Sequence, residues 1–195
     1  MKFLDLNKNQ NNAYPASGTL SSAKALACAG MFAALIFVSI FFLSVPNGLG
    51  GFIHFGDALI FTAAAVLPFP YGLVAAAVGP GLFNLARGPV WLPFTIVIKP
   101  LMAMCFSNKS YAILGSKRNV FAPFLAAGIN TAFYFFANVI LFSLGMLPAQ
   151  HIGAWAAGFA ALPALFVQGV GSVVFFFLIA KALDRANIKE RLFRF

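Results

Sequence analysis

The stretch from Ala25 to Phe106 is almost wholly apolar, yet it carries three formal charges, on Asp57, Arg87 and Lys99. A charge near the centre of a bilayer costs roughly 2.5–3.5 kcal/mol on insertion scales, so a membrane segment seldom keeps one without a use. Arg87 fits an interfacial residue whose long side chain reaches water. Lys99 has no such exit. We therefore expect the function to depend on charges inside this stretch.

Composition assigns the chain to the integral membrane proteins. Hydrophobic residues make up 62% of the sequence, charged residues only 9%, and the mean hydropathy is +0.91. A membrane crossing takes about 20 residues, so the chain has room for some five to seven helices and for no soluble catalytic domain beside them. The predicted fold class is all-α, within a single membrane domain.

Proline- and glycine-rich stretches divide the apolar sequence into six candidate spans. The clearest divider is the run from Pro68 to Gly72, which predicts a tight turn between two short spans. The predicted spans cover residues 25–45, 57–70, 72–87, 90–107, 120–145 and 155–182.

The basic residues predict the topology. Eleven of the 13 lie before residue 25, between residues 107 and 119, or after residue 180. By the positive-inside rule these segments are cytoplasmic, so six spans put both termini in the cytoplasm. The same placement explains the net charge of +9 by topology and attraction to membrane lipid rather than by nucleic acid. The predicted organisation is a lead over 1–24, a membrane domain over 25–183 and a basic tail over 184–195.

Few residues suited to catalysis or metal binding are present. The chain has four acidic residues, and of these only Asp57 lies within the membrane domain, so paired carboxylates for general acid and base chemistry are missing. Cys28 and Cys105 lack metal-ligand spacing, and His54 and His151 stand alone in different loops. We expect no enzyme activity, no metal and no cofactor.

Polar residues recur at helical spacing in three of the later spans. Residues four apart share one face of a helix, so each set forms a stripe. One reading is that such residues join helices by hydrogen bonds in lipid. Together with an aromatic-rich outer loop, they also suit the binding of a flat polar ring. The stripes are Trp91, Thr95 and Lys99; Asn130, Tyr134 and Asn138; and Gln168 with Ser172.

Two readings are open for each of the inner charges. Lys99 either contacts a ligand or forms a structural pair with Asp57, if their spans are neighbours. Asp57 follows Gly56 at the start of a span, so it also fits an N-terminal helix cap. We name Asp57, Lys99, Trp91, Thr95, Tyr134, Asn138 and Gln168 as the candidate substrate-binding residues.

Small residues form a ridge on the first span. Ala25, Ala29 and Ala33 recur every four residues, with Gly30 and Ala34 beside them. Such a ridge lets helices approach closely, and packing within the bundle is its commonest use.

Four motifs resemble a known family. They are Gly51-Phe-Ile-His-Phe-Gly-Asp-Ala-Leu-Ile60, the segment from Gly72 to Gly81, Ala86-Arg-Gly-Pro89, and Pro93-Phe-Thr-Ile-Val-Ile-Lys99. The chain resembles the substrate-binding S component of an energy-coupling factor (ECF) vitamin transporter. Within that superfamily it is most similar to the branch of predicted hydroxymethylpyrimidine or pyridoxine carriers. The resemblance is good over residues 25–106 and architectural beyond them.

The resemblance implies a function and partners. Such a protein captures a water-soluble vitamin or precursor outside and reorients in the membrane against a transmembrane coupling subunit, which two cytoplasmic ATPases drive. It implies that Ala25, Ala29 and Ala33 form the partner-docking surface, and that the ligand sits under the first outer loop. Asn84 stands where relatives often have an acidic residue.

The kind of ring stays open at the level of sequence. Lys99, Arg87, His54 and His151 favour an anionic or phosphorylated ring. Asp57 and the amides instead suit an aminopyrimidine or a pyridinol. A self-sufficient secondary carrier or channel-like protein that uses Asp57 and Lys99 is the alternative function.

Overall fold

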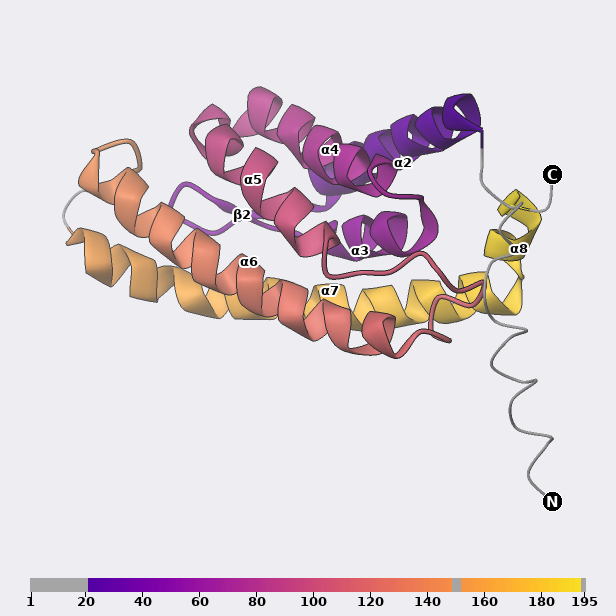
Figure 1. Cartoon of the computed structure of the whole chain (residues 1–195). Coiled ribbons are helices and arrows are strands. Elements are labelled where there is room, and N and C mark those ends of the chain that lie inside the picture. The colour runs from indigo at the N-terminus through magenta and orange to yellow at the C-terminus, as the bar shows by residue number, and fades with distance from the viewer. Residues whose placement is uncertain (1–20, 149–151, 194–195) are drawn as a thin grey trace, which may run out of the picture.

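The structure is a computed structural model, and it describes residues 21–148 and 152–193. The predicted lead over 1–24 therefore falls mostly outside the described residues. Helices dominate the described chain, and Figure 1 shows their arrangement. In chain order the helices are α2 (Ser22–Leu43), α3 (Asp57–Val66), α4 (Tyr71–Arg87), the 3-10 turn η1 (Pro89–Trp91), α5 (Leu92–Ala103), α6 (Lys117–Ser143), α7 (Ala154–Arg185) and α8 (Ile188–Phe193).

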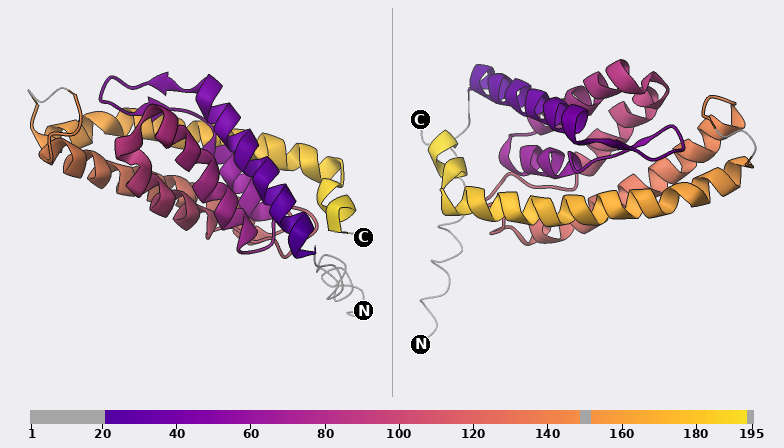
Figure 2. Two further views of the ribbon diagram at one scale, coloured as in Figure 1. Left: turned by 90° about the horizontal axis from the view of Figure 1, so that it is seen from above. Right: turned by 180° about the vertical axis from the view of Figure 1, so that it is seen from behind.

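Three of these helices are long and apolar enough to cross a membrane: α2, α6 and α7. Their outward faces carry large apolar side chains, among them Met31, Phe121 and Phe166, each about 70% exposed. A water-soluble protein rarely exposes so much contiguous apolar surface, whereas lipid solvates it. In Figures 1 and 2, α6 and α7 run side by side as one long antiparallel pair. The chain is therefore an all-α membrane protein.

The helices α3, α4 and α5 are shorter and lie more deeply in the bundle. α3 ends at Val66, four residues before the predicted end of its span, because Pro68 and Pro70 lack the N–H groups that a longer helix needs. At about 1.5 Å per residue, α3 is roughly 15 Å long, half the thickness of a hydrocarbon core. It contacts α2, α4, α5 and α7, so protein rather than lipid surrounds it.

A close approach between α2 and α4 fixes the upper layer of the bundle. Ala25, Ala29 and Ala33 are buried there, with exposures of 0–5%. Opposite them, a Cβ built on Gly79 would stand 2.8 Å from the carbonyl oxygen of Ala33 and 2.8 Å from Cβ of Ile36. Only glycine fits at this position. The ridge thus serves contact within the chain.

This contact predicts a stability difference between two glycines. Gly79→Ala should destabilise the protein by about 1–3 kcal/mol, because a methyl group must push α2 away from α4. Gly128→Ala is the matched control, since nothing lies within 4 Å of a Cβ there and alanine favours a helix. Thermal unfolding in detergent measures both variants. Equal melting temperatures for the two variants would contradict the close contact.

A short hairpin links α2 to α3. Strand β1 (Val45–Pro46) pairs antiparallel with β2 (Phe52–Ile53), with Val45 opposite Ile53. The residues between the strands include Gly48 and Gly50, both with positive φ. The sequence predicts this segment as a glycine-rich outer loop, and the strand pairing was not predicted. Figure 1 shows the hairpin between the α4–α5 layer and the α6–α7 pair.

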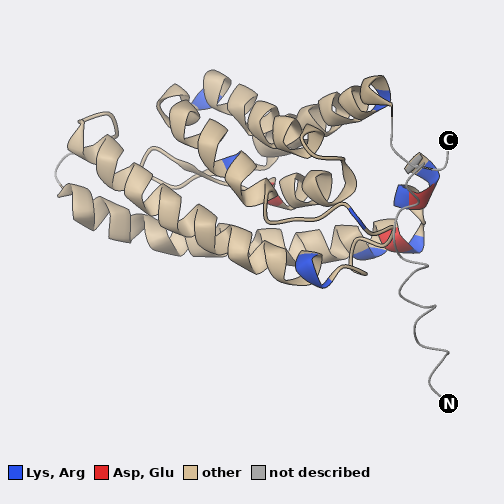
Figure 3. Cartoon of the chain, in the orientation of Figure 1, with Lys and Arg blue, Asp and Glu red and all other residues tan. Residues whose placement is uncertain are grey.

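The opposite end of the bundle gathers most of the described charges, as Figure 3 shows. There, loop 104–116 is fastened to the helices by polar side chains. Asp184 of α7 accepts hydrogen bonds from the backbone N–H groups of Ile113 (2.6 Å) and Leu114 (2.9 Å). Lys189 of α8 donates to the carbonyls of Ala65 and Asn108, each at 2.8 Å. The segment predicted as a basic tail thus packs against the membrane domain.

Candidate ligand site

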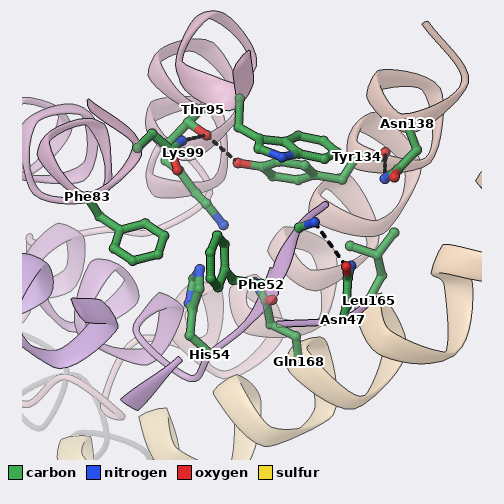
Figure 4. Close-up of a pocket in the computed structure, with 13 residues that line it drawn as sticks. Asn47, Phe52, His54, Phe83, Thr95, Lys99, Tyr134, Asn138, Leu165 and Gln168 are labelled. Atoms are coloured by element: carbon green, nitrogen blue, oxygen red, sulfur yellow. Dashed lines mark hydrogen bonds between the residues drawn. The ribbon is translucent and has the colours of Figure 1, made fainter. Parts of the chain in front are cut away.

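A polar cavity lies beneath the hairpin, in the interior of the helix bundle (Figure 4). About 60 Å³ of it is open to the centres of water molecules. Residues from the hairpin segment, from α4, α5 and α6, and from α7 converge on it. They are Asn47, Gly51, Phe52, His54, Phe83, Asn84, Trp91, Thr95, Lys99, Tyr134, Asn138, Leu165 and Gln168.

A buried ion pair forms the base of the cavity. The Lys99 Nζ atom lies 2.7 Å from Oδ1 of Asp57, and the side chains are 1% and 2% exposed. Gln168 donates to the other carboxylate oxygen at 2.9 Å, and Lys99 also donates to Oδ1 of Asn130 at 2.9 Å. Both oxygens of Asp57 therefore accept from side chains, which makes it a pairing partner rather than a helix cap. The pair ties α3, α5, α6 and α7 together.

A chain of hydrogen bonds runs along one wall. Asn84 of α4 donates from Nδ2 to Oγ1 of Thr95 at 2.5 Å. The Thr95 hydroxyl in turn shares a hydrogen bond with the Tyr134 hydroxyl at 2.7 Å. The Lys99 ammonium lies 5.0 Å from the centre of the Tyr134 ring, within the range of a cation–π contact. The ring of Tyr134 is thus held at both its hydroxyl and its face.

Aromatic rings line two other sides of the cavity. Trp91 and Tyr134 have their ring centres 5.9 Å apart, and Phe52 meets Phe83 edge to face at 5.3 Å. These separations are typical of favourable aromatic pairs. Polar groups at the base and aromatic walls at the sides are the features of a pocket for a flat, polar ring.

Trp91 also fastens the hairpin over the cavity. Its Nε1 donates to the carbonyl of Gly50 at 2.8 Å. A Cβ on Gly50 would stand 2.8 Å from Cδ of Pro148 and 2.9 Å from Cδ2 of Leu147, so the hairpin also touches the segment after α6. Contacts on two sides therefore hold the hairpin beside the cavity.

Loss of this bond should loosen the hairpin. Trp91→Phe keeps an aromatic wall but removes the donor, which is worth about 1 kcal/mol and corresponds to a roughly fivefold population change. Amide hydrogen exchange of residues 45–53 should accelerate by about that factor, while exchange in α6 stays unchanged. Unaltered exchange in the hairpin would show that other contacts hold it. Trp155→Phe, on an indole that is 61% exposed, is the matched control.

Two buried polar atoms at the cavity have no hydrogen-bond partner among the described residues. They are Oδ1 of Asn138 and Nδ1 of His54. Asn138 donates from Nδ2 to the carbonyl of Tyr134 at 2.8 Å, so its remaining oxygen is an acceptor. A buried polar atom without a partner costs free energy, and such atoms at a cavity suit a ligand that supplies the missing bonds.

The structure brings together most of the residues that the sequence predicts as substrate-binding. Six of them line the cavity, and Asp57 lies directly behind Lys99. Sequence reasoning left out the contributions of Phe83 and Leu165, which carry no polar signal. His54 was named from the sequence only as a group that favours an anionic ring, and the hairpin residues Asn47 and Phe52 were not named as site residues. Their only sequence signal is an aromatic-rich outer loop. His151 lies outside the described residues.

The predicted docking ridge lies away from the cavity. Ala25, Ala29 and Ala33 are almost fully buried in the free chain, and the carbonyl of Ala33 lies against Gly79 of α4, so this surface is not open to a partner as the chain stands. The physical reason is the close approach of α4 to α2 at Gly79, which buries the small side chains of the ridge. The small residues left open on α2 include Gly30 and Ala34.

A polar, aromatic-walled cavity inside a bundle of apolar helices defines the class: a membrane protein that binds a small molecule within its helices. A family model described as "ECF-type riboflavin transporter, S component" matches residues 20–185. The chain belongs to this family, and it is thus the S component of an ECF transporter, which is a family of transport proteins and not of enzymes. No curated protein matches the chain.

Proposed function

We propose that the chain captures a water-soluble vitamin or precursor with a single ring and delivers it across the bacterial plasma membrane as part of an ATP-driven importer. The observation that carries the proposal is the small polar cavity under the hairpin. Membership of the S component family supports the transport role. The partners in this proposal are a transmembrane coupling subunit and two cytoplasmic ATPases.

We propose six membrane crossings with both termini in the cytoplasm. The gathering of lysine and arginine residues of the described chain at one end of the bundle (Figure 3) supports this orientation, because basic segments stay on the cytoplasmic side. The cavity then opens toward the outside through the hairpin. In this arrangement residues 25–183 form the membrane domain, residues 1–24 precede it and residues 184–195 follow it.

The size of the cavity supports a single-ring ligand. The space open to the centres of water molecules is only about 60 Å³. So small a space suits one substituted six-membered ring. The three fused rings and ribityl chain of riboflavin need considerably more. Hydroxymethylpyrimidine and vitamin B6-type rings are therefore the favoured substrates.

The charge of the site supports a neutral ring. Lys99 has a carboxylate partner at 2.7 Å, so the pair carries no net charge. Two of the three ammonium protons are already engaged, by Asp57 and Asn130. A phosphate would compete with Asp57 for the lysine and leave a buried carboxylate unpaired, which is costly. An amide oxygen at Asn138 instead suits an amino or hydroxyl donor on the ring.

The exposed small residues of α2 are the favoured docking surface for the coupling subunit. A Cβ on Gly30 would have nothing within 4 Å, and Ala34 lies exposed one turn further on. Small residues on a lipid-facing helix allow another membrane helix to approach closely. This surface takes the place of the covered ridge at Ala25, Ala29 and Ala33.

Mass spectrometry of the small molecule retained on gentle purification tests the substrate. We expect a compound with one ring, and binding titrations should then favour hydroxymethylpyrimidine or pyridoxine over riboflavin, because one ligand fits the cavity and the other clashes with its walls. Tight binding of riboflavin, with a single-ring compound failing to compete, would refute the size argument.

Co-purification tests the transport role. The chain should form a complex with the coupling subunit and both ATPases, and Gly30→Leu should weaken that complex without lowering the stability of the chain alone. A secondary carrier is the second candidate, favoured by the intramembrane Asp57–Lys99 pair. Substrate uptake in cells that lack the ATPases would favour the carrier, and absence of a complex would exclude the importer.

A further inference from the structure

A second cavity lies at the other end of α5, between the turn that joins α3 to α4 and loop 104–116. About 270 Å³ of it is open to the centres of water molecules. Small and apolar side chains form much of its lining, among them Ala64, Leu73 and Ala103. Two basic residues, Lys109 and Arg118, also line it, and the lining includes no acidic residue. This cavity plays no part in the candidate ligand site.

The guanidinium of Arg118 is held in a fixed orientation. Its Nε donates to the carbonyl of Cys105 at 2.7 Å, and its Nη2 donates to the carbonyl of Met104 at 2.5 Å. A guanidinium has five N–H donors, so these bonds leave three for another acceptor. Because the group is planar and forked, it matches two oxygens of one phosphate at once. Arg118 is thus prearranged for an oxyanion.

The loop that carries Lys109 is held in place as well. Asn119 accepts from the backbone N–H of Ser107 and donates to its carbonyl, each at 2.8 Å. Asp184 fixes the far side of the same loop through Ile113 and Leu114. The two basic residues therefore face one cavity from a rigid frame, which reduces the ordering cost of binding.

The surroundings of the cavity are apolar and exposed. Phe69 is 68% exposed and Met104 is 51% exposed, and both belong to the lining. A soluble anion would gain nothing from contact with these apolar side chains. A molecule with an anionic head and an apolar tail contacts both the basic and the apolar part of the lining. Membranes contain such molecules at the level where basic residues border apolar helices.

We propose that this cavity binds the phosphate group of an anionic phospholipid from the inner leaflet, with Arg118 and Lys109 on the phosphate and the acyl chains beside Phe69 and Met104. The side of the membrane rests on the topology given under the proposed function. The binding itself requires neither a vitamin nor an ATPase.

Native mass spectrometry of the full chain tests the proposal. The chain is released from micelles that contain phosphatidylglycerol or phosphatidylcholine with identical acyl chains. We expect retention of phosphatidylglycerol and a roughly tenfold loss of that retention in Arg118→Gln, as for loss of a charge-assisted bidentate contact. Arg87→Gln is the matched control, because Arg87 is an exposed arginine at the opposite end of α4 that packs on Phe41.

Lys109→Gln provides an independent variant, since it leaves the bonds of Arg118 to the backbone intact even if Arg118→Gln fails to fold. It should lower phosphatidylglycerol retention several-fold at unchanged melting temperature. Equal retention of the two lipids overturns the proposal. So does full competition by inorganic phosphate, which would indicate a site for a free anion. The proposal is also overturned if Arg118→Gln and Lys109→Gln leave lipid retention unchanged and weaken only the complex with the coupling subunit. That result would indicate a protein contact.

Discussion

Lys99→Met is expected to destabilise the protein by about 3–5 kcal/mol, because it leaves the carboxylate of Asp57 buried without its counter-ion. The ion pair is 2.7 Å long and both side chains are almost fully buried. The amide oxygen of Asn130 loses its donor as well, whereas Gln168 keeps its hydrogen bond to Asp57. The expected observation is a lower yield of folded protein and a marked fall in melting temperature, together with the loss of ligand binding.

The double variant Asp57→Asn/Lys99→Met distinguishes the effect of losing the whole ion pair from the effect of leaving one charge unpaired. Asparagine still accepts from Gln168 and carries no charge, so most of the lost stability should return. Asp57→Asn alone should resemble Lys99→Met, since it leaves an ammonium unpaired. If Lys99→Met instead folds normally and only loses ligand affinity, the lysine serves the ligand and not the bundle.

Asn138→Leu is expected to weaken ligand binding by roughly 10–100-fold, equivalent to about 1.4–3 kcal/mol, with little effect on folding. The oxygen of this amide is buried at the cavity and has no partner among the described residues. Leucine has a similar size, so packing is kept while the acceptor disappears. Titration of the variant with the compound identified by mass spectrometry measures the loss.

Ser143→Ala is the matched control on the same helix. Its hydroxyl donates to the carbonyl of Val139 at 2.8 Å, just as the Asn138 amide donates to the carbonyl four residues earlier. It lies on the exposed side, away from the cavity. Binding should be unchanged in this control. A comparable loss of affinity in both variants would mean that α6 itself, rather than the amide oxygen, is disturbed.

The all-α membrane fold is predictable from the sequence because hydropathy and the placement of lysine and arginine are local signals. The ends of the helices are less so: α3 ends at Val66 rather than at residue 70, as the prolines that follow require. The use of the alanine ridge was not predictable either. Whether Ala29 faces another subunit or α4 depends on Gly79, which is distant in sequence, and both arrangements need small residues.

The polar wall of the site could be predicted because Trp91, Thr95 and Lys99 share one face of a helix, as do Tyr134 and Asn138. A spacing of four residues is enough to show that side chains share a face of one helix. The hairpin side could not be predicted in the same way, because its contribution depends on a fold-back that places Gly50 next to Trp91. The sequence left open whether Lys99 contacts a ligand or pairs with Asp57. The pairing became visible only in three dimensions, because the two residues are 42 positions apart in the chain.

The neutrality of the ion pair has a consequence for energetics. Moving one elementary charge through a membrane potential changes the free energy by about 2.3 kcal/mol per 100 mV. Since Lys99 and Asp57 cancel, a site that holds a neutral ring transfers no net charge when it passes from one side to the other. Accumulation of the ligand would then be electrically silent and would not depend on the voltage across the membrane.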